Sequence, residues 1–214
     1  MKATKWKSYS LALIAGMSVL TACSSDDNND NGGNGNNGNG NEIENGTTLK
    51  GTITSDVTLT AGSTYKLSGE YIVEDGATLN IEAGVKIISI YDDIVDYILV
   101  KQGGKINAVG TSSAPIVMTS EKEEPGAWGG IHICGKAHTN AEGGKGSSEI
   151  GGATYGGNDD ADNSGTLKYV RVEYSGYAFD SEHEANGITF YGVGNGTTVE
   201  YCQAYKGSDD GFEF

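Results

Sequence analysis

Arginine, proline and long apolar runs are all scarce in this chain. Arg171 is its single arginine, only two prolines occur, and the formal net charge at pH 7 is −15. A chain this acidic repels nucleic acid and anionic lipid surfaces, which excludes both as expected partners. No apolar stretch reaches the ~20 residues that a membrane-spanning helix needs. No long stretch has helical periodicity either, so a mainly helical fold is not expected.

The longest apolar stretch, residues 11–20, follows a basic start with three lysines among the first eight residues. This order, with so short an apolar segment, is typical of a secretory signal peptide. Residues 20–23 read Leu-Thr-Ala-Cys and resemble the lipobox of bacterial lipoproteins, whose cysteine is acylated. We therefore expect residues 1–22 to be removed and Cys23 to carry a lipid anchor, which leaves the mature chain near −18. The alternatives are an uncleaved anchor and a cytosolic protein.

A polar segment follows the anchor. Residues 24–30 are Ser, Asp and Asn and resemble the acidic export signal of lipoproteins on the outer face of the outer membrane in Bacteroidota-type bacteria. The alternative is a merely solvated linker. Residues 31–41 are almost wholly Asn and Gly, have no apolar face to bury and are predicted to be disordered. We assign residues 23–46 to a flexible tether that reaches about 25–30 Å.

Short runs of Val, Ile, Leu, Tyr and Thr fill the rest of the chain, separated by Gly, Asn and Asp. With 34 glycines, this pattern predicts many short strands joined by turns. A β-sandwich would give the same pattern, so internal repeats must decide the architecture.

Two repeats are present. Residues 73–81 return at 100–108 with an offset of 27, and residues 167–172 return at 199–204 with an offset of 32. A looser copy of the first repeat lies at 59–67. Variable periods of this length fit the coils of a solenoid, in which neighbouring coils must stack to form a core. We therefore predict an all-β fold, a right-handed parallel β-helix over residues 47–214.

Two further cysteines, Cys134 and Cys202, lie in strand-like runs. An exported protein permits a disulfide, but buried free cysteine also behaves as a small apolar residue. In the 32-residue repeat Cys202 takes the place of Val170, which favours unpaired thiols over a bridge.

Five segments resemble a family of β-helical surface lipoproteins of Bacteroidota-type bacteria that has no assigned activity. They are residues 73–79, 115–120, 128–131, 155–165 and 208–214. His132, Cys134 and His138 depart from the family pattern. Family members continue well past the last of these segments, so the resemblance implies a β-helix that is incomplete at its C-terminus and ends on an uncovered coil.

Asp160, Asp162 and Ser164 stand at alternate positions before Gly165, as in the first half of a calcium loop. They are the predicted metal ligands, and calcium is the only cofactor predicted. The motif is incomplete, because Arg171 stands where a closing glutamate would be expected. The alternative is a plain acidic turn, since Asp and Asn accept local backbone hydrogen bonds.

Asp209 and Asp210 are the weak catalytic candidates. They look a little like the paired aspartates of polygalacturonases, in which carboxyl groups act as acid and base. The other markers of that class are missing, and lyase chemistry needs a basic residue of which the chain has few. His132, Cys134 and His138 could be zinc ligands, but their spacing is irregular and a fourth ligand is not evident.

We therefore expect a surface-anchored, non-catalytic binding or adhesion module for glycan or host protein. The alternatives are a polysaccharide lyase or hydrolase and a structural component of the cell envelope. Twelve tyrosines, among them Tyr174, Tyr177 and Tyr191, are expected to form aromatic ladders within the fold or to stack on sugars if exposed.

Overall fold

The computed structural model describes residues 41–180 and 183–214. The predicted signal peptide (1–22), Cys23 and the tether up to residue 40 lie outside the described residues. Within the described part, no helix has the length and apolar character needed to cross a membrane.

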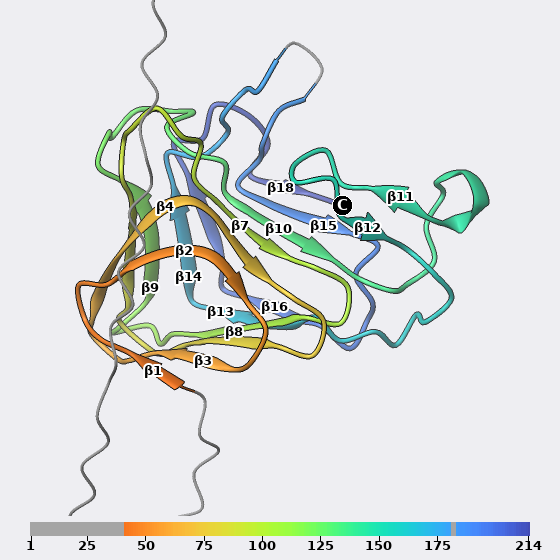
Figure 1. Cartoon of the computed structure of the whole chain (residues 1–214), viewed down its shortest axis with the longest axis horizontal. Coiled ribbons are helices and arrows are strands. Elements are labelled where there is room, and N and C mark those ends of the chain that lie inside the picture. Colours follow the sequence, from red (N-terminus) through yellow and green to blue (C-terminus); the bar gives the residue numbers. More distant parts are fainter. Residues whose placement is uncertain (1–40, 181–182) are drawn as a thin grey trace, which may run out of the picture. The chain divides into compact units, whose positions relative to one another are not determined.

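The described chain consists almost entirely of short strands (Figure 1). The strands are β1 (Asn41–Ile43), β2 (Thr48–Ile53), β3 (Val57–Leu59), β4 (Thr64–Val73), β5 (Thr78–Ile81), β6 (Lys86–Ser89), β7 (Tyr97–Val100), β8 (Lys105–Val109), β9 (Ile116–Ser120), β10 (Ile131–Cys134), β11 (Gly146–Ser147), β12 (Thr154–Tyr155), β13 (Gly165–Lys168), β14 (Val170–Glu173), β15 (Ile188–Tyr191), β16 (Thr198–Glu200), β17 (Gln203–Tyr205) and β18 (Phe212–Glu213). One 3₁₀ segment, Glu142–Gly144, accompanies them.

These strands form three faces around one core. Face 1 is the sheet β1-β3-β5-β8-β13-β16. The second sheet bends within the long strand β4, whose first half pairs with β6 and whose second half pairs with β7. Face 2 therefore continues through β6, β9, β14 and β17, and face 3 through β7, β10, β15 and β18. In Figure 1 the three faces are seen as the sides of a triangle, with β9 and β14 on the left, β8 and β13 below and β7, β10 and β15 at the upper right.

Every pairing between strands of these faces is parallel, and one turn through all three faces makes a coil. Among the strands of the described residues, only the small β11–β12 hairpin pairs antiparallel, and one isolated antiparallel bridge joins Ala178 and Glu184. Parallel strands in one sheet are joined by right-handed crossovers in nearly all proteins. The predicted right-handed parallel β-helix and its all-β class are confirmed.

The two clear repeats predict the register of the coils correctly. Leu79 pairs with Ile106, and Leu167 pairs with Val199, at the predicted offsets. The prediction that residues 59–67 are a looser copy of the first repeat is wrong, because Leu59 pairs with Ile81. The folded part also begins earlier than the predicted boundary at residue 47: β1 pairs with β3 inside the range assigned to the tether.

The core has an inner and an outer part. Alternate residues of each strand point inward, so that Leu79, Ile106 and Leu167 are completely buried in the inner cluster. The outer cluster covers face 3 from outside, where Leu99 and Cys134 pack against Ile150, Ala153 and other residues. Its cover is the excursion, residues 135–164, which joins β10 to β13 and contains the β11–β12 hairpin (Figure 1).

Both remaining cysteines are free. Cys134 is fully buried in the outer cluster, whereas Cys202 is half-buried against the inner cluster. The two thiols thus lie in different clusters, and the prediction that they are unpaired is confirmed.

A candidate binding cleft at one end of the β-helix

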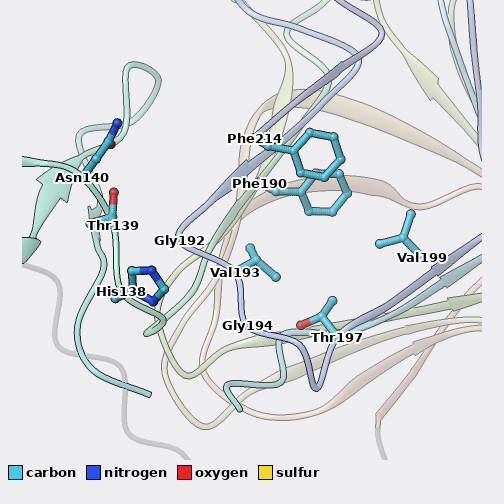
Figure 2. Close-up of a pocket in the computed structure, with 10 residues that line it drawn as sticks. All are labelled: His138, Thr139, Asn140, Phe190, Gly192, Val193, Gly194, Thr197, Val199 and Phe214. Atoms are coloured by element: carbon cyan, nitrogen blue, oxygen red, sulfur yellow. The ribbon is translucent and has the colours of Figure 1, made fainter. Parts of the chain in front are cut away.

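A cleft of about 590 Å³ lies between the start of the excursion and the segment that follows β15. Figure 2 shows the side chains that line it, with residues 138–140 on one side and the Phe190–Phe214 pair on the other. The lining residues are His138, Thr139, Asn140, Phe190, Gly192, Val193, Gly194, Thr197, Val199 and Phe214.

The floor of the cleft is apolar. Phe190 and Phe214 stack with ring centroids 5.2 Å apart and an interplanar angle of 14°. Phe190 points into the inner cluster and is 4% exposed, whereas Phe214, one coil further on, is 92% exposed. Val193 and Val199 extend the apolar surface (Figure 2). The floor therefore combines a buried aromatic ring with a second ring that stacks on it from the next coil.

The opposite side of the cleft, which we call the rim, is polar and consists of residues 138–140. Nδ1 of His138 lies 2.6 Å from Oδ1 of Asp160, and the His138 backbone N–H donates to the same oxygen at 3.1 Å. This hydrogen bond, together with the carboxylate charge, raises the pKa of His138 and lowers that of Asp160. The pair therefore favours a protonated imidazole facing a carboxylate at the rim.

The acidic loop, residues 158–165, holds residues that line the cleft. Asp160 holds His138, while the N–H of Ser164 donates to Oγ1 of Thr197 at 2.8 Å. Asp162 is 8% exposed and accepts a hydrogen bond from Oγ of Ser164 at 3.0 Å and a long one, 3.5 Å, from the Gly194 N–H. Each predicted calcium ligand thus has a protein partner, and all three bond to residues that line the cleft.

No metal cluster is evident in the part of the chain that the structure describes: three or more His, Cys, Asp or Glu side chains nowhere gather in a suitable arrangement. Calcium at Asp160, Asp162 and Ser164 remains a prediction. The sequence placed these residues on one loop, but it could not indicate that their partners lie 22 to 33 residues away, His138 at the start of the same excursion and Thr197 in the next coil.

A family model described as the pectate-lyase-like β-helix domain matches residues 51–214. The chain belongs to this family. No curated protein and no solved structure matches the chain. The family supports the β-helical part of the resemblance drawn from the sequence, whereas the lipoprotein nature and the bacterial group remain predictions.

In this pectate-lyase-like β-helix, Asp209 and Asp210 are exposed, and neither lines the cleft. The backbone carbonyl of Asp210 accepts a hydrogen bond from the Gly187 N–H at 2.9 Å. The carboxyl group of Asp209 is hydrogen-bonded to that of Glu184, and this contact raises the pKa of Glu184. Sequence reasoning missed Glu184, because only the pairing of coils brings it beside Asp209.

The three residues considered as zinc ligands do not share one site. His132 is fully buried, its Nε2 lies 2.7 Å from the carbonyl oxygen of Gly129, and its ring stacks on Tyr191. Burial lowers the pKa of His132 to about 4 and raises that of Cys134 to about 11. Cys134 belongs to the outer cluster and His132 packs against Tyr97 and Tyr191 of that cluster, while His138 bonds to Asp160 at the surface.

Proposed function

We propose that this protein is a surface-anchored, non-catalytic glycan-binding module of the pectate-lyase-like β-helix family, and that the cleft is its binding site. One observation carries the proposal: the stacked pair Phe190–Phe214 forms an aromatic floor opposite a polar rim that the acidic loop holds in place.

Sugar rings have apolar C–H faces and polar edges, so a site for them combines an aromatic surface with a few fixed polar groups. The face of Phe214 supplies the aromatic surface. His138, Thr139 and Asn140 supply donors and acceptors on the facing side, and Thr197 supplies a hydroxyl group on the side of Val199. A volume of about 590 Å³ lies within the ordinary range of small-ligand sites and suits one or two sugar units.

The lining residues favour binding over bond cleavage. Glycoside hydrolysis generally uses two carboxyl groups that flank the scissile bond. Among the described residues that line the cleft, His138 is the only one with an ionisable side chain. Its Nδ1 is already engaged by Asp160, which favours a role as a fixed donor over one as a proton shuttle.

A second candidate, a polysaccharide-active enzyme, is favoured by the contact between Glu184 and Asp209. A glutamic acid with a raised pKa is suited to act as a general acid. These carboxyl groups touch each other, however, whereas those of retaining glycosidases stand about 5 Å apart. Release of reducing ends or unsaturated products that disappears in Asp209→Ala would favour this candidate.

The anchor belongs to the same proposal. We infer that lipid on Cys23 holds the mature chain at the outer membrane, with the β-helix at the cell surface. Substitution Cys23→Ser should release the protein from the membrane fraction and abolish incorporation of labelled fatty acid. Retention of the label in Cys23→Ser would contradict the assignment.

Binding is tested with the mature chain lacking lipid, by calorimetry against a panel of neutral oligosaccharides. Phe214→Ala should weaken binding at least tenfold, because it removes the aromatic floor. Phe179→Ala is the matched control, since this ring is also exposed but does not line the cleft. Binding of a host protein with no glycan binding would replace the glycan proposal, and equal effects of both substitutions would remove the cleft from it.

A further inference from the structure

Four non-glycine residues of the described chain adopt left-handed backbone conformations: Tyr169, Tyr174, Tyr201 and Lys206, with φ between 50° and 60°. They form two pairs with the 32-residue offset of the repeat, Tyr169 with Tyr201 and Tyr174 with Lys206. Tyr169 and Tyr201 stand at the corner between faces 1 and 2, and Tyr174 and Lys206 directly follow the face 2 strands β14 and β17. The strained backbone is therefore confined to two neighbouring coils and to the ends of one face.

A left-handed backbone costs free energy for any residue with a Cβ, and such strain concentrates at functional sites. Glycine would remove the cost, and it occupies the other left-handed positions of the described chain. At these four corners the chain instead keeps a large side chain. Tyr201 and Lys206 are exposed at these corners and Tyr169 is half-buried, whereas Tyr174 is buried beside them.

These groups form one aromatic and cationic surface with their neighbours. Tyr169 and Tyr201 stack with centroids 4.6 Å apart and an interplanar angle of 6°. Nζ of Lys206 lies 5.3 Å from the ring centroid of Tyr205 and 5.5 Å from that of Tyr174. Tyr201 is 68% exposed and Tyr205 is 37% exposed, so ring surface remains open to solvent.

Two more cations lie on the same surface. Nζ of Lys168 is 5.8 Å from the ring centroid of Tyr201, and Cζ of Arg171, the single arginine of the chain, is 4.9 Å from that of Tyr205. Lys168 and Arg171 also pair with Glu200 and Glu173 at 2.7 Å. We name this surface the tyrosine–cation strip; it comprises Lys168, Tyr169, Arg171, Tyr201, Tyr205 and Lys206.

We propose that the tyrosine–cation strip is a second binding site, distinct from the cleft, and that it binds an anionic polysaccharide through its carboxylate or sulfate groups. The exposed rings accept the C–H faces of sugars, and the three cations stand beside them to pair with the anionic substituents. None of the strip residues lines the cleft.

Charge complementarity favours this ligand over a neutral one. The chain as a whole carries −15 and repels polyanions, so only a local surface with clustered cations can hold one. The strip contains three cations but only two acidic partners, so it is a local surface of this kind. The same overall charge opposes nucleic acid, which lacks the C–H face of a pyranose and carries a denser row of charges.

The test uses three polymers with one backbone: dextran, carboxymethyl dextran and dextran sulfate. Binding to the mature chain lacking lipid is measured at 50 and 300 mM NaCl, with a single-stranded oligonucleotide as a further polyanion. At least one charged dextran should bind, and which one does separates carboxylate from sulfate as the recognised group. The affinity should fall at higher salt, and dextran and the oligonucleotide should bind at least tenfold more weakly.

Variants locate the binding. Tyr201→Ala and Lys206→Gln should each weaken it at least fivefold, whereas Lys50→Gln, an exposed lysine in β2, is the matched control and should leave it unchanged. Lys206→Gly separates binding from folding, because glycine relieves the strain at this corner: it should melt at an equal or higher temperature and still bind at least fivefold more weakly. Wild-type affinity in Tyr201→Ala and Lys206→Gly, equal binding of neutral dextran, or equal binding of the oligonucleotide would overturn the proposal.

Discussion

Asp96 accepts a hydrogen bond from Oγ of Ser89 at 2.7 Å, although only 1% of Asp96 is exposed. Its other carboxyl oxygen accepts the backbone N–H of Gly69, in the preceding coil. The carboxyl group thus ties the corner before face 3 to the coil beneath it. Burial outweighs these hydrogen bonds and raises the pKa of Asp96 to about 6.

This raised pKa predicts a pH dependence of stability. The folded protein binds the Asp96 proton more tightly than the unfolded chain, so the contribution is fully present below pH 3.8, the value for an unperturbed aspartate, and is lost as the pH rises through about 6. The free energy of unfolding should fall by up to about 3 kcal/mol from this group between pH 4 and 7.5.

Urea unfolding of wild type and Asp96→Asn across that range isolates the effect, because other groups titrate equally in both. Asn can still accept from Gly69 and donate to Ser89, so the variant should lose the pH dependence and keep the fold. Asp93→Asn, at an exposed neighbour, is the control. Parallel curves for wild type and Asp96→Asn would contradict the assignment.

Coil stacking depends on the missing side chain of Gly165. A Cβ there would stand 2.0 Å from the carbonyl oxygen of Ile106 in the neighbouring coil, at a φ of +120°. Gly165→Ala should therefore destabilise the fold by about 3 kcal/mol or more. Gly76→Ala is the matched control, since its φ is +82° but its Cβ would meet open space, and it should cost about 1 kcal/mol. Similar melting temperatures for both variants would refute this packing.

Gln102 fastens the excursion to the β-helix. Its Nε2 donates to the carbonyl oxygens of Gly135 and Gly156 at 2.7 and 2.8 Å. Gln102→Met leaves both carbonyls without this donor, and we expect a loss of about 2 kcal/mol with faster hydrogen exchange across residues 135–156. Gln203→Met, at an exposed position, is the control. Unchanged exchange in the excursion would show that Gln102 does not fasten it.

We expect Asp160 and Asp162 of the acidic loop to have unequal roles. Asp162 is buried and bonded, so Asp162→Ala should cost about 1–3 kcal/mol. Asp160 is exposed, so Asp160→Ala should leave stability nearly unchanged while weakening glycan binding through His138. Thermal melting with and without EDTA extends the test to the metal. A large fall in melting temperature on chelation, absent in both variants, would instead support the predicted calcium site.

The sequence predicts the coils well where a whole strand and its turn recur. Leu79 with Ile106 and Leu167 with Val199 follow directly from the offsets of 27 and 32, because each residue stacks on its own copy one coil later. The looser copy failed for a local reason. Gly62 and Gly76 both occupy left-handed turns, so their surroundings look alike, although one turn leads into face 2 and the other into face 1.

The candidate sites were harder to predict because their partners are distant in the sequence, at the far end of the same excursion or in the next coil. Asp160, Asp162 and Ser164 look like ligands in the sequence, yet they bond to His138, to Gly194 and each other, and to Thr197. The sequence gives the number of tyrosines but not how they are arranged. The left-handed backbone that projects Tyr169 and Tyr201, and the register that stacks them, emerge only from the fold.

The central claim is that the cleft binds a glycan without cleaving it. A binding oligosaccharide, incubated with the mature chain lacking lipid for a day and recovered for mass spectrometry, tests this most directly. We predict one bound oligosaccharide per chain, recovered with unchanged mass, and binding lost in Phe214→Ala. Shortened or unsaturated products whose formation depends on Asp209 or Glu184 would contradict the claim and make the protein an enzyme.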